Sequence, residues 1–436
     1  MILRDPVHGL VAFEDDAERV VMKLLATREV QRLRRVRQLG LTSLVFPGAE
    51  HSRFAHAIGA AHVMVMLQRH LRARVEVPPP DQRMDTESAR DALAAAMLHD
   101  LGHGPFSHLF EEVVPEARAH EDWTADAIRD PDGEVHAALE AISEGMAERV
   151  ASLLTGEHPI AWLGRTISGT LDVDRFDYLL RDSHMTGVRY GLYDLEWLLR
   201  ALSFAEVDGV GWVLAIEGRK GLPPIESFFL GRQFMYHQVY HHKATRAAEC
   251  LIRGMFRRLA ELIREGSAPV GTPDAVRTAV LGEPLALSSY LDLDDPLLMS
   301  CFALWEDAED PLLADFAARL RHRRLPKTIP LPEDPAAAPQ WAEAKARADE
   351  VATRHGLRPD LNVWLDVPKD TPYHEPDSPS ADGLWVLLSH QAPRRLGDTS
   401  FLLRQLKNQT IVRPRLVFPE AIRDDVERAV EGVLVR

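Results

Sequence analysis

The hydrophobic residues of this chain recur mostly at the spacing of an α-helix. Apolar side chains return every three or four positions between residues 15 and 39, from about 53 to 71, from 86 to 98 and from 225 to about 263. Helical segments are also expected near 131–165, 273–281, 309–323 and 341–355. The pattern therefore predicts a mainly α fold.

Strand-like patterns are shorter and fall in three places. Residues 2–13 alternate around the turn-forming stretch 5–9 and are expected to form a small β-hairpin or an extended lead-in. Residues 202–217 alternate around Asp208-Gly209 and are expected to form a β-hairpin. Beyond residue 265, short strand-like runs at 361–365, 383–388 and 410–418 follow a proline-rich link at 325–335. We therefore predict a helical domain over 1–265 with small β-hairpins, and a C-terminal α+β accessory region over 266–436.

Composition narrows the class of protein. The 436 residues are 46% hydrophobic, contain no apolar run of eighteen, and begin without a charged and then apolar leader, so we expect a cytoplasmic protein that makes no membrane contact. Two cysteines, Cys250 and Cys301, exclude a disulfide framework and a thiolate metal site. The net charge of −15 does not favour nucleic acid as a partner, and a polyanionic substrate would need a local basic pocket.

The stretch 94–112 carries the most distinctive chemistry. A buried helix ends there at His99-Asp100, and His103 and His108 follow. Imidazole and carboxylate groups together bind several divalent ions. Adjacent helical residues point about 100° apart, so further ligands must come from other helices.

Two other helices offer such ligands. His56 lies near the start of one, where a lone histidine is otherwise an ordinary core residue. Asp172 and Asp174 lie at the start of another, beside apolar residues where an unpaired carboxylate is costly. The alternative for this second helix is a set of ion pairs such as Asp177 with Arg181.

Two groups of basic residues could hold phosphates. Arginines 28, 32, 34, 35 and 37 give residues 15–39 a basic face that is either solvated or phosphate-binding. Arg232, Tyr236, Tyr240 and Lys243 recur on one helical face, which either binds phosphate and a sugar or base, or packs into the core.

Several motifs together are far more specific than any one of them. They are Asp5-Pro-Val-His-Gly9, Gln31-Arg-Leu-Arg34, Phe46-Pro-Gly48, His51-Ser-Arg-Phe-Ala-His56, His99-Asp-Leu-Gly-His-Gly-Pro-Phe-Ser-His108 and Asp172-Val-Asp-Arg-Phe-Asp-Tyr178. The chain thereby resembles the HD-domain metal-dependent phosphohydrolases over roughly its first 250 residues. Within them it is similar to the branch of the vertebrate sterile-alpha-motif and HD-domain dNTP triphosphohydrolase and the bacterial dNTPases.

The resemblance implies a helical HD-domain catalytic core and a specific reaction. Water would attack the α-phosphorus of a deoxynucleoside triphosphate and release the deoxynucleoside and triphosphate. The resemblance assigns the metal ligands to His56, His99, Asp100 and Asp174, and the catalytic histidines to His108 with His103 and His120 in support. The implied substrate-binding residues are Gln38, Leu39, Arg53, Arg175, Tyr178, Asp182, Arg232, Tyr236, Tyr240 and Lys243.

Some positions depart from the family pattern. Arg175 stands where the vertebrate enzyme has a lysine, and Tyr236 where it has a histidine. At the guanine-activator site Gln31 and Arg34 match, but Ala26 replaces the base-reading aspartate, which argues against activation by guanine nucleotides and leaves another nucleotide activator open.

The cofactor and the assembly are predicted only coarsely. The ligand set accepts Mn, Fe, Zn, Mg, Co or Ni without distinguishing them, and the resemblance implies a homo-oligomer, either a dimer or a tetramer. Two other functions stay open: an HD-type phosphohydrolase or nuclease acting on another phosphate ester, and a nucleotide-binding regulatory protein that keeps its metal only for structure.

Overall fold

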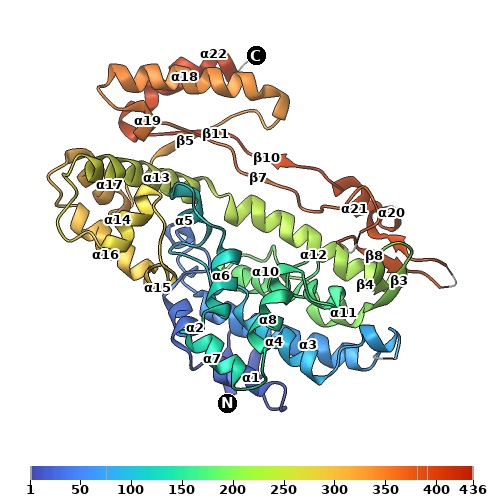
Figure 1. Cartoon of the computed structure of the whole chain (residues 1–436). Helices are drawn as coiled ribbons and strands as arrows, with labels where there is room; N and C mark the ends of the chain where they lie inside the picture. The colour runs from blue at the N-terminus through green and yellow to red at the C-terminus, as the bar shows by residue number, and fades with distance from the viewer. Residues whose placement is uncertain (1, 75, 381, 390, 435–436) are drawn as a thin grey trace.

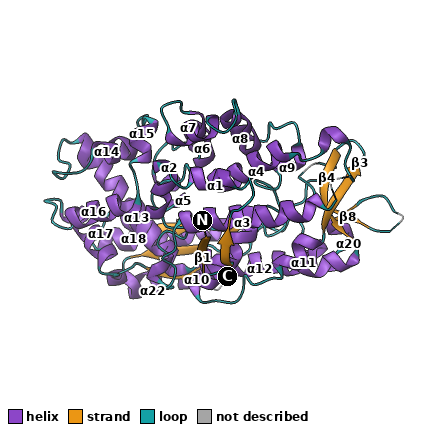
Figure 2. Cartoon of the chain, turned by 90° about the horizontal axis from the view of Figure 1, so that it is seen from below, coloured by secondary structure: helices purple, strands orange, loops and turns teal. Residues whose placement is uncertain are grey.

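The computed structural model describes residues 2–74, 76–380, 382–389 and 391–434, and it confirms the mainly α fold (Figures 1 and 2). The first part begins with the predicted hairpin, β1 (Ile2–Asp5) and β2 (Gly9–Ala12), which pairs Asp5 with Gly9 at its turn. The helices that follow are α1 (Arg19–Leu24), α2 (Arg28–Arg32), α3 (Arg53–Arg72), α4 (Thr86–Leu98), α5 (His108–Val113), α6 (His120–Arg129), α7 (Glu134–Glu140), α8 (Met146–Thr155), α9 (Ala161–Gly164), α10 (Val173–Thr186) and α11 (Leu195–Arg200).

The second hairpin and the longest helix come next. The chain continues through β3 (Leu202–Val207), β4 (Gly211–Glu217), α12 (Leu222–Met235), a π-helical turn (Tyr236–Tyr240) and α13 (Lys243–Arg264). Short 3-10 turns lie at Leu33–Arg35, Thr42–Leu44, Pro80–Gln82, Arg219–Gly221, Pro335–Ala337 and Glu420–Ile422.

The remaining elements belong to the C-terminal part. They are α14 (Asp274–Leu281), α15 (Leu287–Leu291), α16 (Asp295–Trp305), α17 (Pro311–Arg321), β5 (Lys327–Pro330), α18 (Ala338–Arg354), α19 (Pro359–Asn362), β6 (Trp364–Asp366), β7 (Lys369–Asp370), β8 (Trp385–Leu387), β9 (Arg394–Arg395), α20 (Leu396–Thr399), α21 (Phe401–Leu406), β10 (Ile411–Val412), β11 (Arg415–Phe418) and α22 (Arg423–Leu434).

The described residues form four small sheets, and all but the β1–β2 hairpin connect distant parts of the chain. β11 pairs with β5 and β6, and α18 and α22 pack together over this sheet at one end of the molecule (Figure 1). β8 pairs in parallel with β4, so the C-terminal part extends the predicted 202–217 hairpin into a four-stranded sheet. The stretch 325–335, expected to be only a link, thus contributes strand β5.

Helix α3 packs against both α4 and α10. Residues 92–98 of α4 are completely buried, and alanines dominate the run, so neighbouring helices approach closely. Gly59 of α3 faces the side chains of Asp177 and Arg181 on α10 so closely that a Cβ would overlap them. This packing brings the ends of three helices to one place.

Two predicted helices are interrupted. Residues 15–39 form α1, α2 and a 3-10 turn, because Thr27 adopts an extended backbone and its hydroxyl donates to the carbonyl of Leu24. The predicted helix 225–263 is divided by the π-helical turn at Tyr236–Tyr240, and His242 then begins α13 with an extended backbone. Residues predicted to share one face therefore point in different directions.

The two predicted domains share a hydrophobic core. Phe106 and Trp123 from the first part pack with residues of α13, α14, α16 and α17. Trp123 stacks on Tyr290 of α15 at a ring distance of 4.0 Å. The division at residue 265 stays a prediction. Among the described residues, no helix is both long and apolar enough to cross a membrane.

Candidate metal centre and substrate pocket

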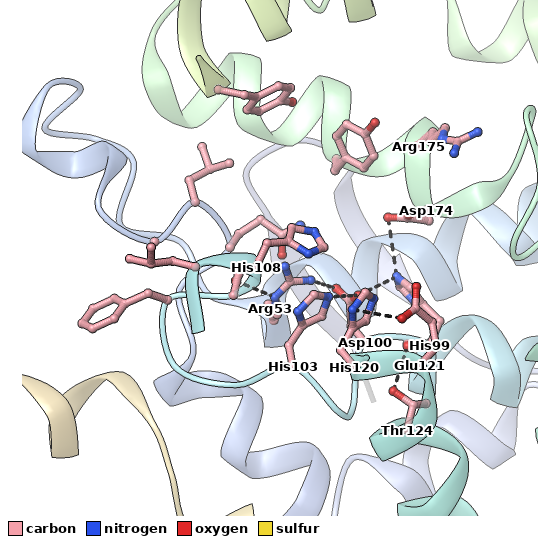
Figure 3. Close-up of a pocket in the computed structure, with 18 of the residues that line it drawn as sticks. Arg53, His99, Asp100, His103, His108, His120, Glu121, Thr124, Asp174 and Arg175 are labelled. Atoms are coloured by element: carbon pink, nitrogen blue, oxygen red, sulfur yellow. Dashed lines mark hydrogen bonds and ion pairs between the residues drawn. The ribbon is translucent and has the colours of Figure 1, made fainter. Parts of the chain in front are cut away.

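A cavity of about 800 Å³ opens where α4, α5, α6, α10 and the π-helical turn meet (Figure 3). This volume lies within the usual range for sites that bind small molecules. Histidine, aspartate and arginine side chains line the cavity together with Tyr178, Tyr236 and Tyr240. Such a lining suits an anionic ligand that also carries a ring.

Three helices bring the predicted metal ligands together. His56 lies in the first turn of α3, His99 follows the last residue of α4, and Asp174 lies in the first turn of α10. The Nε2 atoms of His56 and His99 are 3.2 Å apart, and Oδ1 of Asp174 lies 3.0 and 3.5 Å from them. Oxygens of Asp100 lie 3.6 Å from His56 Nε2 and 3.4 Å from His99 Nε2.

These distances fit a common ion. Ligand atoms about 2.1 Å from one ion lie roughly 3.0 to 3.4 Å apart in octahedral or tetrahedral geometry. Nδ1 of His99 lies 2.9 Å from the carbonyl of Ala96, which can only accept, so this nitrogen carries the ring proton. Nδ1 of His56 lies 2.8 Å from the Asp177 carboxylate and donates to it. The two Nε2 lone pairs therefore face each other and two carboxylates, which is a donor set for a divalent cation.

The pKa shifts of His56 and Asp174 likewise indicate that this cluster is stabilised by a bound positive charge. Burial opposes protonation of His56, yet hydrogen bonds with Asp174 and Asp177 outweigh it and raise its pKa to about 10. Burial also opposes ionisation of Asp174, but hydrogen bonds with His56 and His99 hold its pKa well below the usual range. A bound cation would replace the proton that these residues otherwise share.

A second layer of side chains holds His56 in place. Asp177 is fully buried, pairs with Arg181 on the same helix at 2.7 Å, and lies 2.6 Å from Nε2 of His8. Asp5 of β1 in turn lies 2.8 Å from Arg181. The sequence offered Asp177–Arg181 only as an ion pair; the structure shows that the pair also fixes the ring of His56.

The three histidines expected to be catalytic also lie together. His103 and His120 stack with ring centroids 3.7 Å apart, and His108 stands edge-on to both (Figure 3). Nδ1 of His120 lies 3.0 Å from the carboxylate of Glu111. Burial holds the pKa of His103 well below its usual range, so the ring is neutral near pH 7.

Most of the predicted substrate residues line this cavity. Arg53 donates to Ser107 at 2.9 Å and pairs with Asp100, and the hydroxyl of Tyr240 donates to Asp182 at 2.9 Å. The other carboxylate oxygen of Asp182, Oδ1, lies 2.8 Å from Nε2 of His51. The predicted residues in the lining are Gln38, Leu39, Arg53, Arg175, Tyr178, Asp182, Tyr236 and Tyr240, together with His99, Asp100, His103, His108, His120 and Asp174.

Three predicted residues are placed differently. His56 is buried behind the cavity wall, where it can still face an ion through Nε2. Arg232 is outside the lining: it pairs with Asp370 at 2.9 Å and donates to the carbonyls of Thr371 and Pro372. Lys243 is exposed and also outside the lining, at the first residue of α13 after the π-helical turn.

The sequence did not single out Arg246 and Glu249, which line the cavity from α13. Their side chains pair at 2.7 Å, and Asp366 binds Arg246 from the other side. Burial raises the pKa of Glu249 to about 7. Extending the i, i+3 pattern from Lys243 through these two residues would have identified them.

The basic face predicted over residues 28–37 is largely used within the protein. Arg32 is buried and donates to the carbonyls of Leu101 and Leu293. Arg35 pairs with Asp294. The guanidinium of Arg34 lies 3.6 Å from the centroid of Phe54. This stretch therefore connects the N-terminal helices to α16 as well as exposing positive charge.

Comparison with known proteins places this geometry in a family. The HD domain family matches residues 53–182, which run from the start of α3 to Asp182 on α10. The uncharacterized protein YwfO of Bacillus subtilis is 35% identical over 373 residues, which are 85% of this chain and 80% of YwfO. A phosphohydrolase from Bacteroides thetaiotaomicron has the same fold, with a TM-score of 0.79 at 24% identity over 96% of this chain and 100% of that chain.

Relatives with a named activity are more distant. The deoxynucleoside triphosphate triphosphohydrolase SAMHD1 of Bos taurus is 28% identical over 64% of this chain and 51% of its own length. The SAMHD1 homolog of Dictyostelium discoideum is 30% identical over 60% of this chain and 50% of its own length. The chain thus spans about half the length of these two relatives. Its HD-domain match and its similarity to YwfO show that it belongs to the HD-domain phosphohydrolase superfamily.

Proposed function

We propose that this protein hydrolyses deoxynucleoside triphosphates to deoxynucleosides and triphosphate with the help of a divalent metal ion. The observation that carries the proposal is the convergence of the His56 and His99 lone pairs and Asp174 beside His108 in one cavity. The names of the SAMHD1 relatives support a deoxynucleoside triphosphate as the substrate.

The metal centre would be His56, His99, Asp100 and Asp174. When bound, the ion would supply positive charge for phosphoryl oxygens and make water a better nucleophile near neutral pH. The protein orients the ligands through Asp177 and the carbonyl of Ala96. Arg53 pairs with Asp100 and also donates a hydrogen bond to Ser107.

His108 is positioned to act as the general acid. Its side chain is 67% exposed at the start of α5 and lines the cavity. The reaction forms a bond between the water oxygen and the α-phosphorus and breaks the bond from that phosphorus to the 5′-oxygen of the deoxyribose. The departing oxygen needs a proton, which His108 donates, and proton transfer of this kind contributes typically 10²- to 10⁴-fold to a rate.

The tyrosines supply a surface for the sugar and base. The rings of Tyr178 and Tyr240 lie 6.3 Å apart at 74°, and Asp182 fixes Tyr240 through its hydroxyl. Gln38 and Leu39 line the same cavity. We propose that close packing of these groups around the deoxyribose disfavours a 2′-hydroxyl.

Product analysis tests this proposal. The metal-reconstituted protein is incubated with each of the four dNTPs, singly and mixed, and with the matching rNTPs, and the products are separated by chromatography. We expect deoxynucleoside and intact triphosphate from dNTPs, with the rNTPs much slower. Turnover only in the mixture would reveal a nucleotide activator. Release of monophosphate or inorganic phosphate would overturn the proposed site of attack.

A second candidate is hydrolysis of another phosphate ester. Among the described residues, the arginines that line the cavity are Arg53, Arg175 and Arg246, and each of them is already within ion-pair distance of a carboxylate. Because Arg232 is held by Asp370 as well, fewer cations are free for a triphosphate than the family pattern implies. A smaller phosphate ester needs fewer of them, and turnover of a simple monoester or diester with no turnover of dNTPs would favour this function.

Three further expectations stay predictions from the sequence. They are a homo-oligomeric assembly, a nucleotide activator other than guanine nucleotides, and a cytoplasmic location. Sedimentation of the protein with and without nucleotides addresses the first two.

A further inference from the structure

A second group of potential metal ligands lies beside the first. His103 follows the end of α4, His108 and Glu111 lie on α5, and His120 begins α6. One ligand atom from each of the four side chains lies within 4.8 Å of the others. The Glu111 carboxylate oxygen is 3.0 Å from His120 Nδ1, 3.9 Å from His103 Nδ1 and 4.0 Å from His108 Nδ1.

The hydrogen bonding of His103 is incomplete without a ligand. Its Nε2 lies 3.2 Å from the Asp100 carboxylate and donates to it, so Nδ1 bears a lone pair. This Nδ1 is buried and has no hydrogen-bond partner within the part of the chain that the structure describes, and the Glu111 carboxylate, 3.9 Å away, is also an acceptor. A cation between the two would satisfy both.

The stacking of His103 and His120 favours a metal over a second proton. Two protonated imidazoles with centroids 3.7 Å apart would repel each other, whereas two neutral rings can both ligate. Ligand atoms of a tetrahedral zinc site lie about 3.4 Å apart, so the separations of 3.0 to 4.0 Å between Glu111 and the three histidines need only small side-chain movements.

We propose that His103, His108, Glu111 and His120 form a second, zinc-binding site distinct from the centre at His56, His99, Asp100 and Asp174. Three imidazoles and one carboxylate suit four-coordinate Zn²⁺, and zinc binds such ligands more tightly than Mn²⁺ or Fe²⁺. Asp100 lies between the sites, since Oδ1 is 3.4 Å from His99 Nε2 and 3.2 Å from His103 Nε2.

This site has a regulatory consequence, which rests on the proposed function. Zinc bound to His108 occupies the nitrogen that would protonate the leaving group, so the second zinc ion inhibits turnover. Activity is therefore expected to rise as the first site fills and to fall as the second fills. In Glu111→Gln the falling phase should shift to at least tenfold higher zinc concentration.

Metal content tests the site without any need for activity. The full chain is stripped with a chelator, dialysed against Zn²⁺ and freed of excess ion, and zinc per chain is then measured. We expect two zinc ions in the native chain and one in Glu111→Gln, whose side chain is half-buried and nearly isosteric. His108→Ala, at the exposed position, is a second variant with the same expectation. His322→Ala, an exposed histidine paired with Glu306, is the matched control and should retain two.

The assignment of each ion follows from a further pair of variants. His56→Ala should lose the first ion and keep the second, and the double variant His56→Ala/Glu111→Gln should bind none. One zinc ion in the native chain, or two in both Glu111→Gln and His108→Ala, would overturn the proposal. Two zinc ions in a protein that does not hydrolyse dNTPs would uphold this site and contradict only the proposed function.

Discussion

Oδ2 of Asp177 lies 2.8 Å from Nδ1 of His56 and thereby decides which nitrogen of this histidine faces the cavity wall. The carboxylate takes the ring proton at Nδ1 and leaves Nε2 as a ligand directed at His99 and Asp174. Arg181 pairs with the same carboxylate at 2.7 Å and keeps it ionised inside the protein, where burial alone would oppose its charge.

Replacing Asp177 should weaken metal binding although the residue is not itself a ligand. Asp177→Asn removes the charge that fixes His56, and we expect divalent-ion affinity at the first centre to fall about 10- to 100-fold. Competition against a chelating fluorophore measures the change. Asp126→Asn, at an exposed aspartate of α6, is the matched control. A folded Asp177→Asn protein with native affinity would contradict the role assigned to this carboxylate.

His108→Ala should separate turnover from metal binding at the first centre. Loss of the general acid is expected to lower kcat about 10²- to 10⁴-fold, while the Mn²⁺ content of the His56 centre stays unchanged because His108 lies on another helix. Steady-state kinetics and metal analysis on the same sample measure the two effects. Native turnover in this variant would require a different proton donor.

Arg232 is expected to stabilise the protein more than it binds substrate. It is largely buried and holds Asp370 and two carbonyls of the C-terminal segment, so Arg232→Ala leaves a buried carboxylate unpaired. We expect the free energy of unfolding to drop by about 3 kcal/mol, as measured by urea denaturation. Unchanged stability together with a strongly raised KM would instead indicate that Arg232 binds the substrate, as the family pattern implies.

Asp295 should make stability depend on pH. This residue begins α16 and accepts hydrogen bonds from the backbone N–H groups of Phe106 and Arg37. Burial nevertheless raises its pKa to about 6, against 3.8 without burial. Between these values the unfolded chain is ionised and the folded chain keeps the proton, so the stabilisation present below pH 3.8 is lost as the pH rises through about 6.

Asp295→Asn removes this dependence. We expect the stability of the variant relative to the native chain to increase by roughly 2 kcal/mol between pH 4 and pH 7. Urea denaturation at several pH values measures the difference. A difference that does not change with pH would show that the carboxyl is ionised in the folded protein.

Periodicity in the sequence predicted the helices that position the first centre. His56, His99 and Asp174 lie on α3, at the end of α4 and on α10 because apolar residues at helical spacing bury these three helices against one another. The hairpins at 2–12 and 202–217 could also be predicted from nearby residues alone, because the turn residues that favour each hairpin lie between its two strands.

What the sequence could not predict depends on contacts between distant residues. The parallel pairing of β8 with β4 joins segments about 170 residues apart, and no local pattern encodes it. Arg232 and Lys243 stand on either side of the π-helical turn at Tyr236–Tyr240 and outside the cavity lining, and the partner that holds Arg232 lies on β7. Glu111 was missed as a neighbour of three histidines because its role appears only once α5 and α6 are packed.

The most direct test of the proposed reaction follows the oxygen of water. A single dNTP, or the dNTP mixture if an activator is required, is turned over in H₂¹⁸O, and the products are analysed by mass spectrometry, with a chelator-treated sample as the control. Attack at the α-phosphorus predicts one ¹⁸O in the triphosphate, an unlabelled deoxynucleoside and no turnover after chelation. Label in the deoxynucleoside, in a monophosphate or in inorganic phosphate would contradict the proposed reaction.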